Sequence, residues 1–132
     1  PHPPIKECYA YKFIGSKKIV FSGDTRYFEP LASFSKKSDV LVHEAILPKY
    51  IDKIVKKTGL SLKLKKHLES SHTKLEEVIK IAKLSNCKKL IINHLIPNDN
   101  TLKQRRVWQK KINNKINTKV IIGQDKLRIK LY

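Results

Sequence analysis

The chain has 132 residues, and its 29 Lys and Arg against 11 Asp and Glu give a formal net charge of +18. Hydrophobic residues make up 40% of the sequence, which is too large a share for a wholly disordered segment, so we expect one folded domain. No apolar run approaches the roughly 18–20 residues that a membrane-spanning helix needs. The first residues carry no charged-then-apolar leader, so a soluble cytoplasmic protein is expected.

The two cysteines, Cys8 and Cys87, stand far apart in the sequence and form no C-x-x-C pair. This spacing argues against a disulfide scaffold or a zinc ribbon. Because both lie beside apolar runs, we expect two buried free thiols in a reducing compartment.

The excess of basic residues favours polyanionic partners such as nucleic acid. Most of the lysines are spread as pairs along the chain, as on a solvated surface, and they match no known basic motif. The densest stretch, 103–115, includes Arg105, Arg106 and Trp108, and it is the best candidate for a helix that faces an anion. Contact with RNA and a merely solvated lysine-rich surface therefore both stay open.

In chain order, short apolar runs alternate with longer amphipathic stretches. Strands are predicted over residues 8–13, 17–22, 40–42, 90–92 and 120–122, and helices over 50–57, 73–84 and 101–114. The first two strands form a hairpin around Gly15, and the alternating residues 127–131 are predicted to pair with 120–122. Residues 59–70 show no clear pattern. Strands that alternate with helices predict an α/β layered fold.

The helix at 73–84 has the strongest pattern, because four apolar residues at helical spacing share one face. Thr73 followed by Glu76 predicts a capping box at its start, in which each side chain satisfies a free backbone amide. Asn86 is the predicted end of the helix.

Three of the predicted buried strands run directly into polar residues. Asp24 follows the strand at 17–22, His43 and Glu44 follow the strand at 40–42, and His94 follows the strand at 90–92. The carboxyl ends of parallel strands meet at one edge of a sheet, so we expect these side chains to face one crevice, where His72 can join them. Carboxylates and imidazoles are ligands that Zn²⁺ prefers, and bound metal supplies hydroxide for hydrolysis.

Each of these residues also has a structural interpretation. A histidine after a strand is more often a hydrogen-bonded structural residue than a ligand. The stretch 22–25 also reads as a turn, with Gly23 supplying unusual backbone angles and Asp24 bonding to its neighbours. The repetition of the pattern on three strands favours a metal site.

Read in order, these motifs resemble the metallo-β-lactamase superfamily, and most closely its ribonuclease Z and arylsulfatase-like branch. The blocks that carry the resemblance are HPP at 2–4, FSGDT at 21–25, DVLVHEA at 39–45, SHT at 71–73 and LIINHLIP at 90–97. The resemblance implies the C-terminal half of an αββα sandwich, in which a mixed sheet is flanked by helices.

The resemblance also implies roles for five residues. His2 would bind one metal, Asp24 would bridge two metals, and His94 would bind the second, with Zn²⁺ as the metal. His72 would stabilise the scissile phosphate or protonate the leaving group, and Glu44 would orient His72. The parent enzyme would hydrolyse phosphodiesters, including tRNA 3′ ends, through a metal-bridging hydroxide. Sulfate esters are the alternative substrates, since residues 22–44 resemble arylsulfatase-like members as closely.

One part of the family pattern is missing. No two histidines have the spacing of the H-x-H-x-D-H run, which supplies four metal ligands. We therefore interpret residues 1–132 as a partial domain that lacks the N-terminal half of the sandwich. Such a chain leaves each metal short of ligands and exposes an apolar sheet face, so we expect little or no hydrolase activity from it alone.

The expected partners are a complementing N-terminal half, a second copy of the chain, and RNA or another polyanion. A split or truncated enzyme, an inactive remnant and a basic RNA-binding module are the three interpretations that the sequence leaves open.

Overall fold

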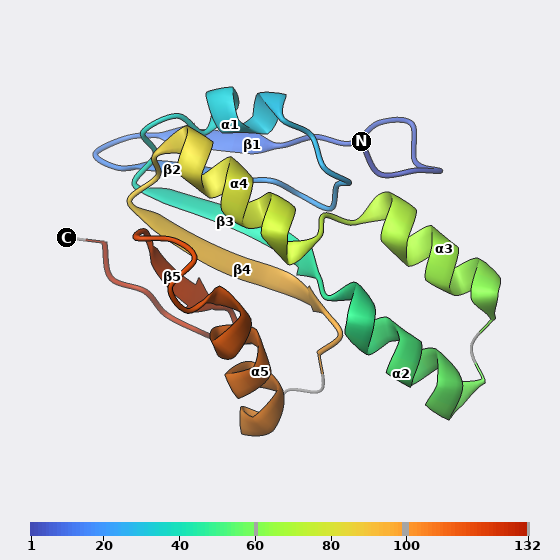
Figure 1. Ribbon diagram of the computed structural model, residues 1–132. Helices are drawn as coiled ribbons and strands as arrows, with labels where there is room; N and C mark the ends of the chain where they lie inside the picture. The colour runs from blue at the N-terminus through green and yellow to red at the C-terminus, as the bar shows by residue number, and fades with distance from the viewer. Residues whose placement is uncertain (60, 99–100, 132) are drawn as a thin grey trace.

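The computed structural model describes residues 1–59, 61–98 and 101–131. Its strands are β1 (Tyr11–Ile14), β2 (Lys18–Phe21), β3 (Val40–Ile46), β4 (Lys89–Ile96) and β5 (Lys119–Ile122). Its helices are α1 (Pro30–Phe34), α2 (Pro48–Thr58), α3 (Leu62–Ser71), α4 (Leu75–Ser85) and α5 (Leu102–Ile112). The strands form one sheet in the order β1-β2-β3-β4-β5, as Figure 1 shows. The predicted α/β class is confirmed.

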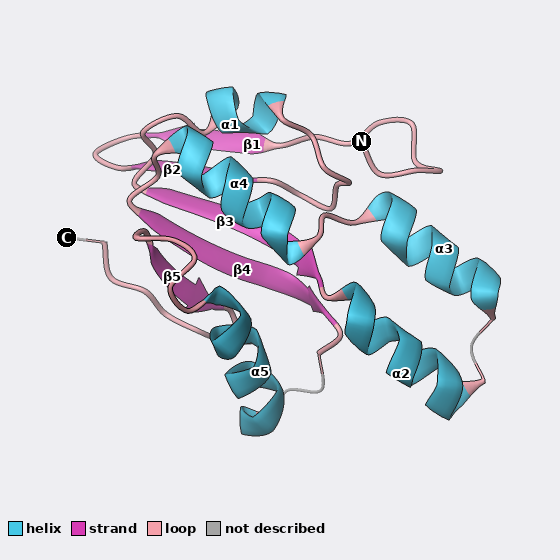
Figure 2. Cartoon of the chain, viewed as in Figure 1, coloured by secondary structure: helices cyan, strands magenta, loops and turns pink. Residues whose placement is uncertain are grey.

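The sheet is mixed. β1 and β2 form the predicted antiparallel hairpin, whereas β2, β3, β4 and β5 all run parallel. Because the connections between parallel strands must cross over, helices fill the intervals, and Figure 2 shows this alternation. The carboxyl ends of β2, β3 and β4 therefore meet at one edge, which becomes the candidate site.

One predicted element is absent from the structure, and two observed helices were not predicted. Residues 127–131 are not a strand, and α1 and α3 were not predicted. Helix α3 lacks a strong apolar stripe, but Ser61 is a cap signal that the sequence carries, since its Oγ accepts a hydrogen bond from the Leu64 amide at 3.3 Å. Pro30 at the first turn of α1 is a second such signal.

One face of the sheet is packed against α1, α4 and α5. Its core consists of alternate strand residues and the apolar stripe of α4, namely Val20, Leu41, Leu90, Ile92, Leu75, Val78, Ile79 and Ala82. Trp108 of α5 belongs to this core: it is fully buried, and its indole N–H donates to the carbonyl of Pro97 at 3.2 Å. Trp108 is therefore a core residue, and it does not lie on the solvent-facing side of α5.

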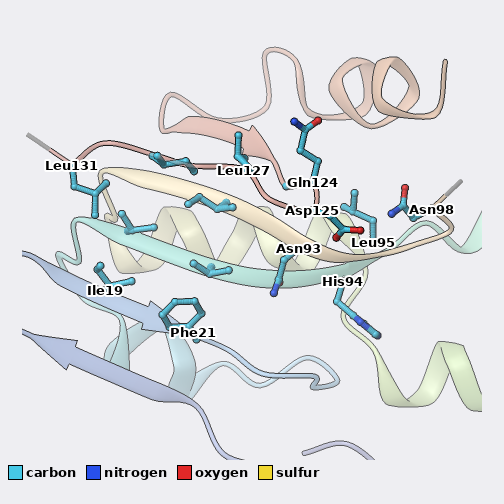
Figure 3. A pocket seen from close by; sticks show the side chains of 15 residues that line it. Ile19, Phe21, Asn93, His94, Leu95, Asn98, Gln124, Asp125, Leu127 and Leu131 are labelled. Carbon is cyan, nitrogen blue, oxygen red and sulfur yellow. The ribbon is translucent and has the colours of Figure 1, made fainter. Parts of the chain in front are cut away.

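The opposite face of the sheet has no covering layer among residues 1–59, 61–98 and 101–131. It carries a hollow of about 680 Å³ whose walls are mainly apolar side chains of β2, β3 and β4 and of the C-terminal segment. Leu127, Ile129 and Leu131 line this hollow, which explains the apolar alternation that had suggested a strand. Figure 3 shows His94 at one end of the hollow and Ile19 and Leu131 toward the other.

The thiols differ from each other. Cys87 is buried as expected, and burial raises the pKa of its thiol, whereas Cys8 is partly exposed, contrary to the prediction. Both are free cysteines. None of the helices in the described part of the chain is long and apolar enough to cross a membrane.

Candidate active-site edge

Five side chains singled out from the sequence come together at the carboxyl edge of the sheet. Asp24 follows β2, Glu44 lies in β3 and His94 lies near the end of β4. His72 is the residue at which α3 ends, and His2 lies in the N-terminal loop beside the end of α3. The fold thus brings these segments together at one edge of the sheet, as predicted, although Asp24 and His94 line different hollows.

Three imidazoles and one carboxylate form a continuous row along this edge. The ring of His2 meets the ring of His72 edge-on, with centroids 4.8 Å apart. His72 stacks on His94 at 5.4 Å, and His94 Nε2 lies 3.5 Å from Asp24 Oδ2. Asp24 and His94 are about half exposed, so the row ends in solvent at the side where a substrate can approach.

The buried carboxylate of Glu44 links the segments that form this edge. Its side chain is 1% exposed, and Oε1 accepts hydrogen bonds from the backbone amides of Thr25, at 3.2 Å, and Thr73, at 2.9 Å. The Thr73 hydroxyl donates to the carbonyl of Thr25 at 2.6 Å. This one carboxylate therefore links the turn after β2 and the segment before α4 to β3, in addition to the backbone hydrogen bonds from Ser22 to Val42 and from Ile46 to Thr73.

These bonds overturn the predicted capping box. Thr73 is not the cap of α4, because its hydroxyl and amide are both used at the site. The helix instead starts after Lys74, whose amide donates to the Glu77 carboxylate at 3.0 Å. Its end at Asn86, in a left-handed conformation, is as predicted.

Glu44 also faces His72. Glu44 Oε2 and His72 Nδ1 are 3.3 Å apart, and both atoms are buried without a hydrogen-bond partner among the described residues. Burying two polar atoms without a hydrogen bond lowers the stability of the fold, and such unsatisfied groups are rare in native structures. The Glu44–His72 pair is therefore a candidate for a functional role. A protonated His72 would complete an ion pair there.

His94 reaches the row because of a β-bulge. Glu44 pairs with Asn93 and Ala45 pairs with Leu95, so that His94 is one extra residue in β4. Its φ is +39°, a conformation that residues other than glycine seldom adopt. Without the extra residue, strand alternation would place this side chain on the same face as Ile92, in the core.

The turn that carries Asp24 depends on Gly23, as predicted. Gly23 has a φ of +62°, and a Cβ at this position would lie 2.8 Å from the carbonyl oxygen of Tyr9. Glycine therefore allows the turn after β2 to approach the N-terminal segment closely.

His43 is not part of the edge, contrary to the prediction. It is fully buried on the helix-covered side of β3, and its Nδ1 lies 2.7 Å from the carbonyl oxygen of Glu44. Burial lowers its pKa, and Nε2 has no hydrogen-bond partner in the described part of the chain. Strand alternation is the reason, because consecutive residues of β3 point to opposite sides.

A fourth histidine, His67, was not singled out from the sequence. Its ring lies 6.4 Å from that of His2, and its Nδ1 lies 3.3 Å from the Ser71 hydroxyl. Ser71 fixes the N-terminal loop, since its hydroxyl donates to the carbonyl of Pro3 and its carbonyl lies 2.8 Å from His2 Nδ1. His67 and Ser71 are four residues apart, which places their side chains next to each other only because this segment is a helix.

The donors of this edge do not form a complete metal site. Across residues 1–59, 61–98 and 101–131, no group of three or more His, Cys, Asp or Glu side chains is arranged to hold a metal ion. Asp24 and His94 supply one carboxylate and one imidazole, whereas a catalytic zinc takes three protein ligands. The residues present therefore do not fit a metal by themselves.

Comparison with known proteins gives the fold and the relatives. A metallo-β-lactamase fold protein of Bacillus subtilis, YhfI, superposes with a TM-score of 0.62 at 22% identity, covering 93% of this chain and 42% of that protein. The short form of human tRNase Z superposes with a TM-score of 0.52 at 16% identity over 89% of this chain and 36% of that one. No protein-family profile matches the chain. The chain has the metallo-β-lactamase fold.

The sequence relatives name the branch. Ribonuclease Z of Macrococcus caseolyticus is 35% identical over 109 residues, which is 83% of this chain and 31% of that protein. Ribonuclease Z 1 of Schizosaccharomyces pombe is 29% identical over 93 residues, 70% of this chain and 10% of that one. The chain is similar to these ribonuclease Z proteins, and it spans a third or less of their length.

Proposed function

We propose that this chain contributes the leaving-group side of a ribonuclease Z-like phosphodiester hydrolase. The observation that carries the proposal is the buried pair of Glu44 and His72, 3.3 Å apart, beneath a solvent-facing Asp24–His94 contact. A carboxylate that faces one ring nitrogen orients an imidazole, and a proton on the ring is available to an alkoxide leaving group.

In this proposal His72 is the catalytic acid and Glu44 is a positioning residue. Glu44 has no freedom to move, since two backbone amides hold it in place. His72 stacks on His94 on one side and meets the ring of His2 edge-on at the other, and these contacts restrict the plane of its ring. Asp24, His94 and His2 are proposed as a share of the zinc ligands. The remaining ligands must come from residues other than those described, because these three do not form a site.

The open face of the sheet supports the same proposal. Phe13 is 59% exposed there and packs edge-on against Phe21 at 5.9 Å, in a patch continuous with the 680 Å³ hollow. Exposed apolar surface of this kind marks an interaction site, and the face lies beside His94. We propose that a second sheet of the αββα sandwich covers it, either from the same polypeptide or from another.

The test combines this chain with the part of the Macrococcus ribonuclease Z that lies outside the matched residues. Two substrates are compared: a precursor RNA with a poor leaving group and bis(p-nitrophenyl) phosphate with a good one. A general acid contributes roughly 10²–10⁴-fold, and a good leaving group does not need it. His72→Ala is therefore expected to lower RNA cleavage by at least about 100-fold while leaving the nitrophenyl ester much less affected.

The matched control is Lys63→Ala, at an exposed residue of α3 outside the proposed machinery, which should retain both activities. An equal loss on both substrates in His72→Ala would overturn the leaving-group role. Hydrolysis of p-nitrophenyl sulfate in place of the phosphodiesters would favour the sulfate-ester alternative.

The second candidate function is that of a basic RNA-binding module. The observation that favours it is the row of solvent-facing cations on α5, at Lys103, Arg106 and Lys110, within a chain of net charge +18. Such binding must weaken steeply with salt. RNA affinity should be unchanged in Asp24→Ala and His94→Ala but should decrease when Arg105 and Arg106 are neutralised. An RNA affinity that does not change with salt would exclude this function.

A further inference from the structure

A second hollow, of about 530 Å³, has Asp24 in its wall but none of the histidines of the row. The N-terminal loop, the turn after β2 and helix α1 line it, and its wall includes Lys6, Asp24, Phe28 and Phe34. Its volume falls within the range of about 300–1,000 Å³ that is usual for small-molecule sites. None of the functions derived so far uses this hollow.

The walls of the hollow carry aromatic rings that the fold leaves in solvent. Phe28 is 44% exposed and Phe34 is 38% exposed, although both are large enough to stabilise a core when buried. Lys12 Nζ lies 4.1 Å from the ring centroid of Phe34, and Lys6 lies in the wall. Apolar rings next to cations match a ligand that has a flat aromatic part and a negative charge.

The position of the hollow indicates which ligand this is. Asp24 lies in the wall of the hollow and also contacts His94, so the hollow and the proposed hydrolytic edge share one side chain. A molecule whose phosphate lies at Asp24 and His94 has its neighbouring group directly at the aromatic rings. An unpaired nucleotide in an RNA strand has this arrangement of phosphate and base.

We propose that this hollow is a base-binding pocket for an unpaired ribonucleotide next to the phosphate at the Asp24–His94 edge. Phe28 stacks on the base, and Lys6 and Lys12 neutralise the backbone of the strand. The proposal rests on the proposed hydrolase function for the identity of the phosphate, but binding of the base is measurable without cleavage.

The test is equilibrium binding of a fluorescent oligouridylate, compared with a strand of the same length in which the bases are replaced by abasic residues. Stacking contributes about 1–3 kcal/mol per base, which corresponds to roughly 5- to 150-fold in affinity. Phe28→Ala should lose this factor on the oligouridylate and nothing on the abasic strand. Phe28→Tyr, which keeps an aromatic ring, should restore binding.

The matched control is Phe13→Ala, which removes another exposed phenylalanine, on the opposite face of the sheet, and should leave RNA binding unchanged. Circular dichroism of each variant shows that the fold is intact. Equal affinity of the unmodified chain for the two strands, or equal losses in Phe28→Ala and Phe13→Ala, would overturn the pocket. If His72→Ala selectively loses RNA cleavage while Phe28→Ala binds the oligouridylate normally, the base-binding pocket is wrong. The hydrolase proposal would still hold in that case.

Discussion

The carboxylate of Asp24 lies 3.5 Å from Nε2 of His94, although the two residues are separated by 69 intervening positions and belong to different strand ends. This contact joins the turn after β2 to the bulge in β4 across the intervening β3. It is the one direct link in the histidine row between a carboxylate and an imidazole that both face solvent. The contact depends on two unusual backbone conformations, one at Gly23 and one at His94.

The bulge at His94 makes a first prediction. A β-branched residue is disfavoured at a positive φ, so His94→Val should destabilise the fold by about 1–3 kcal/mol. His94→Gly should leave the free energy of unfolding unchanged or slightly raised, because glycine accepts this φ. Urea unfolding measures both. Asn93→Val, at the exposed neighbour, is the control, and an equal loss there would show that the strand end and not the φ is responsible.

Glu44 makes a second prediction. Glu44→Ala leaves the amides of Thr25 and Thr73 without an acceptor in the interior, which costs about 1–3 kcal/mol per group. Glu44→Gln keeps an oxygen for these amides and should cost less. The measurement is the midpoint and slope of chemical denaturation. Glu76→Ala, at an exposed glutamate of α4, should change the free energy of unfolding by less than about 0.5 kcal/mol.

His43 predicts a pH dependence of stability. Burial lowers its pKa below 6.5, the value to which it returns in the unfolded chain. Below pH 6.5 the unfolded chain therefore binds a proton that the folded chain does not. As a result, the free energy of unfolding decreases as the pH is lowered. The stabilisation is fully present above pH 6.5 and is lost as the pH drops toward the lowered pKa.

The measurement for His43 is chemical denaturation between about pH 7 and pH 5, in the unmodified chain and in His43→Leu. The variant should show a flatter dependence on pH, because it has no imidazole to protonate on unfolding. Identical slopes in the two proteins would contradict the assignment of this proton to His43.

Asp39 predicts a second pH window, at the amino ends of the parallel strands. The amide of Lys18 and then the ammonium of Lys88 lower the pKa of its carboxyl to about 2. The stabilisation by this carboxylate is present above pH 3.8 and is lost as the pH falls from 3.8 to about 2. Asp39→Asn should therefore reduce the loss of stability in this range, as followed by circular dichroism, whereas Asp125→Asn should not.

The incomplete donor set predicts the metal behaviour of the chain alone. With fewer than three donors in place at the edge, Co²⁺ added to the 132-residue chain should produce no tetrahedral visible spectrum with one-to-one stoichiometry. Combined with the remainder of a ribonuclease Z, the same titration should give a stoichiometric spectrum that Asp24→Asn abolishes. A stoichiometric spectrum of the chain alone would show that the edge rearranges into a complete site.

The sequence by itself determined the class of fold, the parallel strands and the residues that end them. The short apolar runs at 40–42 and 90–92 indicate buried strands, and the segments that follow parallel strands lie near one edge of the sheet. The turn at Gly23 followed from the same reasoning, since a glycine between polar residues has few other uses.

Only the tertiary structure decided which side of the sheet each residue faces and which backbone groups it holds. His43 and Glu44 are adjacent in sequence, yet alternation buries one in the core and places the other under the site. The extra residue in β4 moves His94 to the edge, and Thr73 bonds to Thr25 instead of capping its helix. These outcomes depend on partners far away in the chain, and local sequence patterns carry no information about such partners.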